Sequence, residues 1–288
     1  MTERLFLRLH EDLTQGPESA APADTLRSLP VPAALRQQVG HSLMYRESFA
    51  DGVEVTERVL PDGAVRLVLD LATPPSATGE APNALIIGAS SSAAMVQLQG
   101  QMHGLSITLL PGATMALFGL PAGELAGTAV SLHELLKDDA APLGERLATA
   151  AGAEARVEVL WSVLLQRLPR RPSTASAQVA KAIGVITATG DRVRLSDVAD
   201  TIGVGERRLQ QLFHTHVGLS PRGMGRLSRL HHLLRALRRR PADGWAALAV
   251  DAGFYDQSHL VNEFQSLCGV TPTEFISRTV SGSSKTAS

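Results

Sequence analysis

The sequence predicts an α+β chain of two domains: an antiparallel β domain followed by helices at the N-terminus, and an all-α domain at the C-terminus. The chain has 288 residues, which is enough for two domains of ordinary size. Short β-rich runs separated by Gly, Pro and Asn fill much of the first part, whereas the second part has the periodicity of amphipathic helices. Between them, residues 169–177 are rich in Pro, Ser and Ala, which predicts a linker.

The first domain, residues 1–168, is expected to begin with its strands. Two β-rich runs flank Pro61, Asp62 and Gly63, which together form a turn signal. In the second run, a period of two places these residues on one face: Val65, Leu67, Leu69 and Leu71. Similar short runs occupy residues 83–89, 93–100 and 103–112, so we expect an antiparallel sheet or a small barrel.

Helices are expected after Pro111, and the last of them covers residues 153–168. Its apolar stripe consists of Val157, Leu160, Trp161, Leu164 and Leu168. Packing of this stripe onto the sheet of its own domain is one interpretation. A seam between two copies of the chain is the other, and both interpretations place Val163 and Arg167 outside the core stripe.

The second domain begins with a pattern typical of a helix-turn-helix. A first helix is predicted by apolar residues at helical spacing: Leu195, Val198, Ala199 and Ile202. Gly203 ends this helix and Val204 fills the turn. A second helix starts near Gly205, and three of its side chains are expected to face the core: Leu209, Leu212 and Phe213. A generic helical hairpin would show the same pattern, so this segment by itself leaves that alternative open.

The same plan recurs in residues 245–270, "WAALAVDAGFYDQSHLVNEFQSLCGV". Gly253 breaks the helix and Phe254 is the buried residue of the turn. Asp256 can cap the next helix, because its carboxylate can accept a hydrogen bond from an exposed backbone N–H. The core-facing residues of that helix are Leu260, Phe264 and Leu267. Gln and Asn side chains are left on the outer face, and these are the side chains that can bind adenine bidentately in a major groove.

Composition limits the class of protein. Residues 173–288 hold 14 Lys and Arg against 9 Asp and Glu, whereas residues 1–172 hold 13 against 19. This asymmetry suggests that only the second part meets a polyanion, with a chance excess on a solvated surface as the alternative. The N-terminus lacks the apolar core of a signal peptide, and no stretch reaches the length of a membrane span. We therefore expect a soluble, cytoplasmic protein.

No motif predicts catalysis or metal binding. Cys268 is the single cysteine, which excludes a disulfide framework and a Cys-based zinc site. The histidines of the first part show no metal-ligand spacing, and its serine run lacks the G-x-S-x-G elbow. No glycine-rich phosphate loop follows a predicted strand. The expectation is a protein that is not an enzyme and holds neither metal nor cofactor.

Two segments, "LSDVADTIGVGERRLQQLFHTHVGLSP" and "AGFYDQSHLVNEFQSLCGVTPTEF", resemble the two motifs of the AraC/XylS family of bacterial transcription regulators. The resemblance implies a double helix-turn-helix domain over residues 178–279, whose units enter successive segments of the major groove. Residues 221–237 would form the long helix that joins the units, with His231 and His232 partly exposed. Residues 280–288 are expected to be a disordered tail.

The resemblance also implies which side chains face DNA. On the first recognition helix these are Arg207, Gln210 and Gln211. On the second they are Gln257, Ser258, His259, Val261 and Asn262. Arginine can reach guanine and glutamine can reach adenine, although family members differ and not all of these residues are expected to touch bases. Gly205 departs from the Ser or Thr of many members, which removes a capping hydroxyl.

Family members commonly join an N-terminal sensing or dimerising domain, often cupin-like, to the DNA-binding domain. The resemblance therefore implies double-stranded promoter or operator DNA and RNA polymerase as partners, and it allows a small-molecule effector and a homodimer. The residues that would bind the effector are unknown. Two alternatives stay open: a ligand-independent regulator whose N-terminal domain only dimerises, and a DNA-repair methyltransferase fusion with Cys268 as nucleophile.

Overall fold

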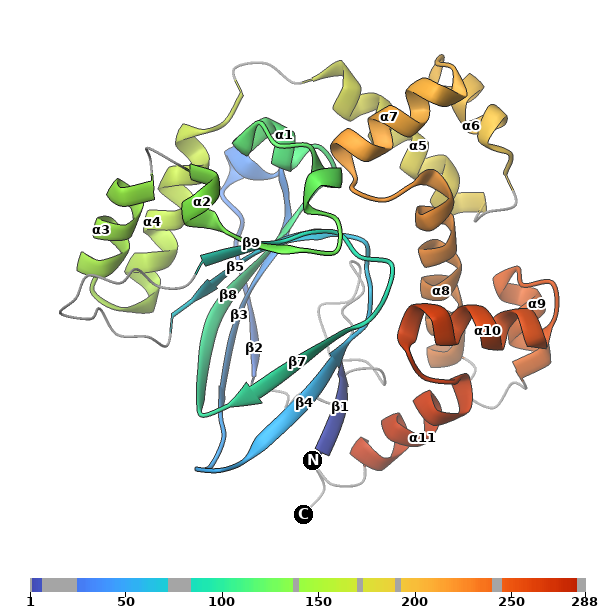
Figure 1. Cartoon of the computed structure of the whole chain (residues 1–288), viewed down its shortest axis with the longest axis horizontal. Helices are drawn as coiled ribbons and strands as arrows, with labels where there is room; N and C mark the ends of the chain where they lie inside the picture. The colour runs from blue at the N-terminus through green and yellow to red at the C-terminus, as the bar shows by residue number, and fades with distance from the viewer. Residues whose placement is uncertain are drawn as a thin grey trace.

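The structure of the chain is a computed structural model, which describes residues 2–6, 25–71, 84–136, 140–169, 173–189, 193–239 and 245–283 (Figure 1). It confirms the predicted α+β organisation, because sheets and their covering helices come first and a group of helices follows. Within these described ranges, no helix is both long enough and apolar enough to cross a membrane.

The larger sheet has six strands, and every neighbouring pair is antiparallel. In spatial order the strands are β2 (Leu26–Leu29), β3 (Val39–Ser48), β8 (Gln101–Leu109), β5 (Val65–Asp70), β6 (Ala84–Ile87) and β9 (Ala129–Ser131). The predicted alternation of β5 is confirmed, since its buried side chains are Val65, Leu67 and Leu69. The sequence pattern does not predict β3, because Ser42, Leu43 and Met44 are buried in succession and hide the period of two.

A smaller sheet has the order β1 (Thr2–Phe6), β4 (Glu54–Val59) and β7 (Ala94–Gln99). β1 runs parallel to β4, a pairing that the sequence patterns do not predict, whereas every other pair among the described strands is antiparallel, as expected. No tight turn connects these two strands, so chain geometry does not impose an antiparallel pairing. The turn at Asp62 and Gly63 carries the chain from β4 in this sheet to β5 in the larger one. Residues of both sheets line a mostly apolar cavity of about 300 Å³.

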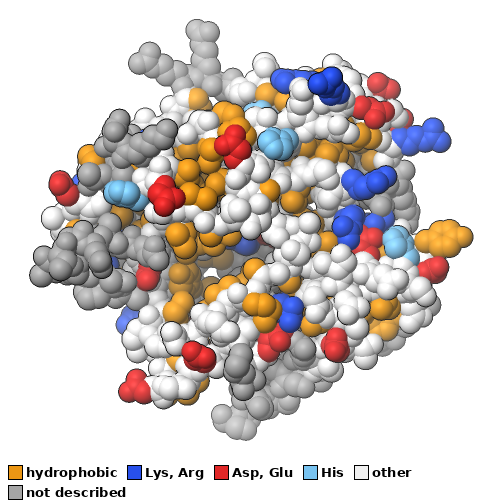
Figure 2. Space-filling model, in the orientation of Figure 1, with side chains coloured by type: hydrophobic (Ala, Val, Ile, Leu, Met, Phe, Trp, Pro, Cys, Tyr) orange, Lys and Arg blue, Asp and Glu red, His pale blue; other side chains and the backbone are white. Residues whose placement is uncertain are grey.

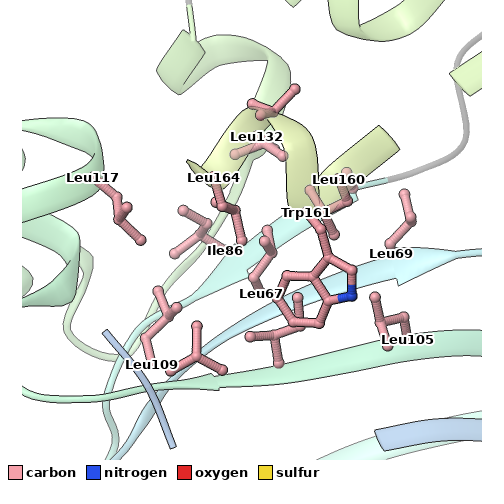
Figure 3. Packing of buried hydrophobic residues seen from close by; sticks show 14 of the residues in the cluster. Leu67, Leu69, Ile86, Leu105, Leu109, Leu117, Leu132, Leu160, Trp161 and Leu164 are labelled. Atoms are coloured by element: carbon pink, nitrogen blue, oxygen red, sulfur yellow. The ribbon is translucent and has the colours of Figure 1, made fainter. Parts of the chain in front are cut away.

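Helices cover the other face of the larger sheet (Figure 1). They are α1 (Ala113–Phe118), α2 (Leu132–Leu136), α3 (Ala140–Thr149) and α4 (Gly152–Gln166), together with the short 3-10 helices η1 (Ala33–Leu35) and η2 (Ala122–Leu125). Figure 3 shows Trp161 of α4 packed over the sheet beside Leu67 and Leu105. The helices predicted after Pro111 are therefore present and form one layer of the domain.

The apolar stripe of α4 packs onto the sheet of its own domain, as the first of the two interpretations expects. Leu160 and Leu164 are fully buried there. Val163, expected outside the core stripe, is only 8 % exposed. Arg167 donates a hydrogen bond to the Leu117 carbonyl oxygen at 3.3 Å. The sheet therefore covers the predicted stripe, whereas Leu165 on the same helix is exposed.

The C-terminal part is all-α, as predicted. Its helices are α5 (Thr174–Thr189), α6 (Leu195–Ile202), α7 (Glu206–His216), α8 (Pro221–Arg239), α9 (Trp245–Ala252), α10 (Gln257–Cys268) and α11 (Pro272–Ser283). α5 begins inside the predicted linker range 169–177, because Ala175 and Ala177 are strong helix formers. α11 extends to Ser283 and so includes the first residues of the predicted tail 280–288, whose remainder lies outside the described residues.

Two separate cores hold these helices together. One lies among α5, α6 and α7 around Phe213. The other lies among α8, α9, α10 and α11 around Phe264, and it includes Leu60 from the end of β4. Because a residue of the N-terminal domain belongs to this second core, the two domains share a packed interface.

Candidate nucleic-acid interface

The first helix-turn-helix unit consists of α6 and α7. Gly203 ends α6 with a φ of 73°, a conformation that glycine adopts without strain. The Val204 amide donates to the Ala199 carbonyl at 3.0 Å, which closes the turn. Gly205 is the N-cap residue of α7. Glycine has no side chain, so no side-chain hydrogen bond caps this helix. The buried residues of α7 include Leu209, Leu212 and Phe213, as predicted.

The outer face of α7 carries the predicted side chains. Arg207, Gln210 and Gln211 are all exposed. Gln210 also lines a groove of about 990 Å³ between α7 and the η2 segment of the N-terminal domain. Of these three side chains, Gln210 therefore lies beside the N-terminal domain, at the edge of this groove.

The second unit consists of α9 and α10 and follows the same plan. Gly253 has a φ of 88°, and the Phe254 amide donates to the Ala249 carbonyl at 2.8 Å. The Asp256 carboxylate accepts a hydrogen bond from the His259 backbone N–H at 2.7 Å, which confirms the predicted N-cap. Buried residues of α10 include Leu260, Phe264 and Leu267, as predicted.

The five predicted DNA-facing residues of α10 fall into two groups. Gln257, Ser258 and Asn262 are exposed. Val261 is half-buried against the core of this unit. The His259 Nε2 atom lies 3.1 Å from a Glu263 carboxylate oxygen, and its ring packs edge-on against Phe254 at 5.7 Å between centroids. His259 is therefore engaged within the domain, and its contact with DNA stays a prediction, as do those of the other site residues.

A buried ion pair, which the sequence patterns do not predict, joins the recognition helix α10 to the joining helix α8. Arg229 of α8 donates to both carboxylate oxygens of Glu263 at 2.7 and 2.8 Å. Both side chains are 7 % exposed, and the Arg226 guanidinium lies 3.5 Å from the same carboxylate. One signal is present in the sequence: Glu263 follows Leu260 by three positions and so occupies a core position of the helix.

Tyr255 precedes Asp256, the N-cap of α10, and the sequence patterns do not single it out. Its side chain is 89 % exposed, although it stands next to the buried Phe254. On the face drawn in Figure 2, Lys and Arg side chains gather mainly over the C-terminal helices, in agreement with the charge asymmetry of the sequence.

The N-terminal domain contacts both helix-turn-helix units. The Gly112 amide donates to the His216 carbonyl at the end of α7, at 2.7 Å. The Ala93 amide donates to the Leu267 carbonyl near the end of α10, at 2.8 Å. Arg58 donates to the Cys268 carbonyl at 3.4 Å. The N-terminal domain thus holds the C-terminal ends of both recognition helices.

The joining helix α8 is also part of this interface. The His231 Nε2 atom lies 3.1 Å from the Pro61 carbonyl oxygen, so His231 faces the N-terminal domain. The His231 side chain is half-buried, in agreement with the partial exposure expected for it, and its neighbour His232 is exposed. Burial, the largest cause, lowers the pKa of His231, although the Pro61 carbonyl and Asp62 act in the opposite direction.

Two family models match separate parts of the chain. Residues 198–278 match a helix-turn-helix domain. Residues 27–131 match a domain of unknown function, DUF6597. No curated protein gives a significant match.

Several solved structures are similar to the chain. One is a transcriptional regulator with an AraC-type DNA-binding domain from Chromobacterium violaceum, with 21 % identity over 36 % of this chain and 94 % of that chain and a TM-score of 0.34. Another is ToxT from Vibrio cholerae, with 12 % identity over 82 % of this chain and 97 % of that chain and a TM-score of 0.40. ToxT with a bound unsaturated fatty acid is 11 % identical over 82 % and 94 %, with a TM-score of 0.37. At these identities the similarity concerns the fold alone.

Proposed function

We propose that this chain, which joins an AraC-type helix-turn-helix domain to an N-terminal domain of unknown function, is a sequence-specific DNA-binding transcriptional regulator. One observation carries the proposal. Each of two helix-turn-helix units buries its apolar residues and leaves exposed Arg, Gln or Asn side chains on its second helix. These side chains can hydrogen-bond to base edges in a major groove, which is wide enough to admit a helix.

The way in which the two units are joined supports binding to one continuous DNA site. α8 has 19 residues and extends from the end of the first unit to the start of the second. The Arg229–Glu263 pair fixes α10 to this helix, so the second recognition helix cannot rotate independently. Double-stranded promoter or operator DNA, contacted in the cytoplasm of a bacterial cell, and RNA polymerase are the partners that this function requires.

We further propose that a small molecule bound to the N-terminal domain modulates DNA binding. The N-terminal domain contacts the ends of both recognition helices, so its state affects their relative position. A ligand shifts such an equilibrium only by its different affinity for the two states. The acidic N-terminal part would also repel DNA from nearby, which favours stronger DNA binding when the contact between the domains loosens.

Two other functions remain as alternatives. A regulator whose N-terminal domain only dimerises would bind no effector, and thermal-shift screening of the full chain with metabolites would show no stabilised form. A methyltransferase would use Cys268 as its nucleophile. That thiol is fully buried and burial raises its pKa, so it lacks both the access and the thiolate that nucleophilic attack needs.

The first expected result concerns the base-reading side chains. Gln257→Ala and Asn262→Ala should each weaken binding to the cognate site by about 1–3 kcal/mol where a bidentate base contact is lost. Because both side chains are exposed, folding should be unchanged. Gel-shift titrations at fixed salt, with cognate and random DNA, measure the loss. Gln166→Ala, an exposed glutamine at the end of α4, is the matched control. Cognate binding equal to that of the control in both variants would rule out base reading by α10.

The second expected result concerns pH and the contact between the domains. Because the folded pKa of His231 is lowered, the unfolded chain takes up this proton first as the pH falls. The stability contributed by neutral His231 is therefore complete above the unfolded pKa of about 6.5 and is lost as the pH falls from there towards the folded pKa. Asp62 and Arg235 are the charged groups that act on this ring.

His231→Gln should reduce the loss of melting temperature between pH 7.5 and 5.5, because an amide can still donate to the Pro61 carbonyl and does not titrate. His232→Gln, an exposed neighbour on the same helix, is the control and should leave the pH dependence as it is in the wild type. An equal loss of melting temperature in wild type and His231→Gln would show that another group sets the pH dependence.

A further inference from the structure

A second cavity, distinct from the one between the sheets, lies between the two domains. Its volume is about 490 Å³, which is within the range of small-molecule sites. The N-terminal domain contributes the turn between β4 and β5 and the segment from the end of β8 to α1. The C-terminal part contributes α5, the end of α7 and one face of α8. Neither domain forms this cavity alone.

Two buried side chains that line the cavity have polar atoms without a hydrogen-bond partner in the part of the chain that the structure describes. They are the Thr114 Oγ1 atom and the His216 Nδ1 atom. Thr114 is 2 % exposed and His216 is 7 % exposed. Buried polar groups in proteins nearly always have a partner, and each one left without it destabilises the fold.

The segment just before Thr114 contacts His216 across the domain interface. The Gly112 amide, two residues before Thr114, donates to the His216 carbonyl at 2.7 Å. A Cβ atom placed on Gly112 would lie 3.4 Å from His216 Nδ1. At this contact the cavity is therefore lined by Thr114 of the N-terminal domain and by His216 of the C-terminal domain.

Thr114 and His216 are polar side chains, and the Arg208 guanidinium is the charged group that acts on the His216 ring. Burial lowers the pKa of His216, so its ring is neutral near pH 7 and offers one donor and one acceptor nitrogen. The Thr114 hydroxyl can also donate and accept. Apolar side chains form much of the remaining wall: Val65, Leu109, Ile183, Val217 and Leu227.

Two charged residues, Asp62 and Arg235, also line the cavity. Arg235 lines the cavity eleven residues after Met224 on α8, which corresponds to roughly 16 Å along a helix. Asp62, on the opposing loop, is already paired with Arg66. A cation placed beside Thr114 and His216 would lose its hydration and would be repelled by the Arg208 guanidinium, which acts on the His216 ring. A hydroxyl group, which donates and accepts, suits both atoms.

We propose that this interdomain cavity binds an uncharged, mainly apolar small molecule with a hydroxyl group, such as a phenol or another aromatic alcohol, and that Thr114 and His216 bind that hydroxyl. The proposal builds on the proposed function, because it places the effector between the domains and not between the two sheets. A molecule in this position contacts α7, α8 and the N-terminal domain together. It binds the docked arrangement best and therefore shifts the chain towards it.

The test uses 2-naphthol as the probe and the full chain without DNA. Fluorescence titration should detect saturable binding to the wild type. Thr114→Val, which keeps the shape of the side chain and removes the hydroxyl, should weaken 2-naphthol binding by about 3- to 10-fold, the worth of one hydrogen bond. Binding of 2-methoxynaphthalene, which cannot donate, should be weaker than that of 2-naphthol and should change little in the variant.

The melting temperature of Thr114→Val without ligand supplies an independent readout. Because the hydroxyl has no partner among the described residues, its replacement by a methyl group should leave the melting temperature unchanged or raise it. A fall would show that the hydroxyl already has a structural role and would overturn the proposal.

Val68→Phe distinguishes this cavity from the one between the sheets, because Val68 lines only the latter. The proposal predicts that 2-naphthol binding survives this change. It is overturned if Val68→Phe abolishes binding while Thr114→Val does not, or if the wild type shows no saturable binding up to the solubility of 2-naphthol. Binding is measured without DNA, so a failure of the chain to bind DNA would contradict the proposed function and leave this site intact.

Discussion

Replacement of Phe264 by alanine should lower the free energy of unfolding of the second helix-turn-helix unit by about 3–5 kcal/mol. Phe264 is 1 % exposed and lies at the centre of the core formed by α8, α9, α10 and α11. Its ring packs edge-on against Trp245 and Phe275, with centroids 6.4 and 5.4 Å away. Removal of the ring leaves a cavity among α9, α10 and α11. These helices also pack on α8 and on Leu60 of the N-terminal domain, which limits how far they can move to fill the cavity.

Denaturant unfolding followed by tryptophan fluorescence measures this loss. The chain has two tryptophans, so a Trp161→Phe background leaves Trp245, beside Phe264, as the only reporter. Gln265→Ala, an exposed neighbour on α10, is the control and should shift the midpoint only slightly. Equal midpoints for Phe264→Ala and this control would mean that the buried and exposed faces of α10 are assigned the wrong way round.

Glu263→Gln should lower the stability of the same unit by about 3 kcal/mol or more, because it leaves the buried Arg229 guanidinium without its carboxylate. The amide has nearly the shape of the carboxylate, so no cavity contributes to the loss. The Arg226 guanidinium, 3.5 Å from the same carboxylate, would add repulsion once the negative charge is removed. The orientation of α10 relative to α8 should change as well, and binding to cognate DNA should weaken beyond the loss of stability.

The double variant Arg229→Met with Glu263→Leu separates the cost of removing one carboxylate from the worth of the buried pair. Replacement of a buried ion pair by apolar residues of similar size is often neutral or stabilising. We therefore expect the double variant to recover most of the stability that Glu263→Gln loses, as measured by the same unfolding experiment. If the double variant is as unstable as Glu263→Gln, the pair is needed for packing and not only for charge balance. If Glu263→Gln is as stable as the wild type, Arg229 is adequately paired elsewhere.

Much of the C-terminal domain could be predicted from the sequence. Gly203 and Gly253 end helices, Asp256 caps α10, and the buried positions Leu260 and Phe264 follow the helical period. These features depend on residues within one or two helical turns of each other. Hydrogen bonds, caps and the side-chain period act over that range, so the sequence determines them locally.

The N-terminal sheets were less predictable. Runs of β-rich residues correctly indicated β4, β5, β6, β7 and β8, but not which strands pair. β4 and β5 follow each other in sequence and lie in different sheets, and β1 joins β4 in parallel. Strand pairing is set by contacts between residues far apart in the chain, and a period of two is the same for every possible partner.

Only the tertiary structure decided which distant residues meet, both within the C-terminal domain and between the two domains. The sequence alone determined two helix-turn-helix units with polar outer faces, together with a β domain before them. It did not indicate that Glu263 pairs with Arg229, that His231 faces Pro61, or that Thr114 and His216 line the same cavity. Each of these pairs joins segments that are 34 to 170 residues apart. A polar residue at a core position can be recognised in a sequence, but its hydrogen-bond partner cannot. Burial of a polar group costs desolvation free energy, and only a partner that the folded chain places within hydrogen-bond distance offsets that cost.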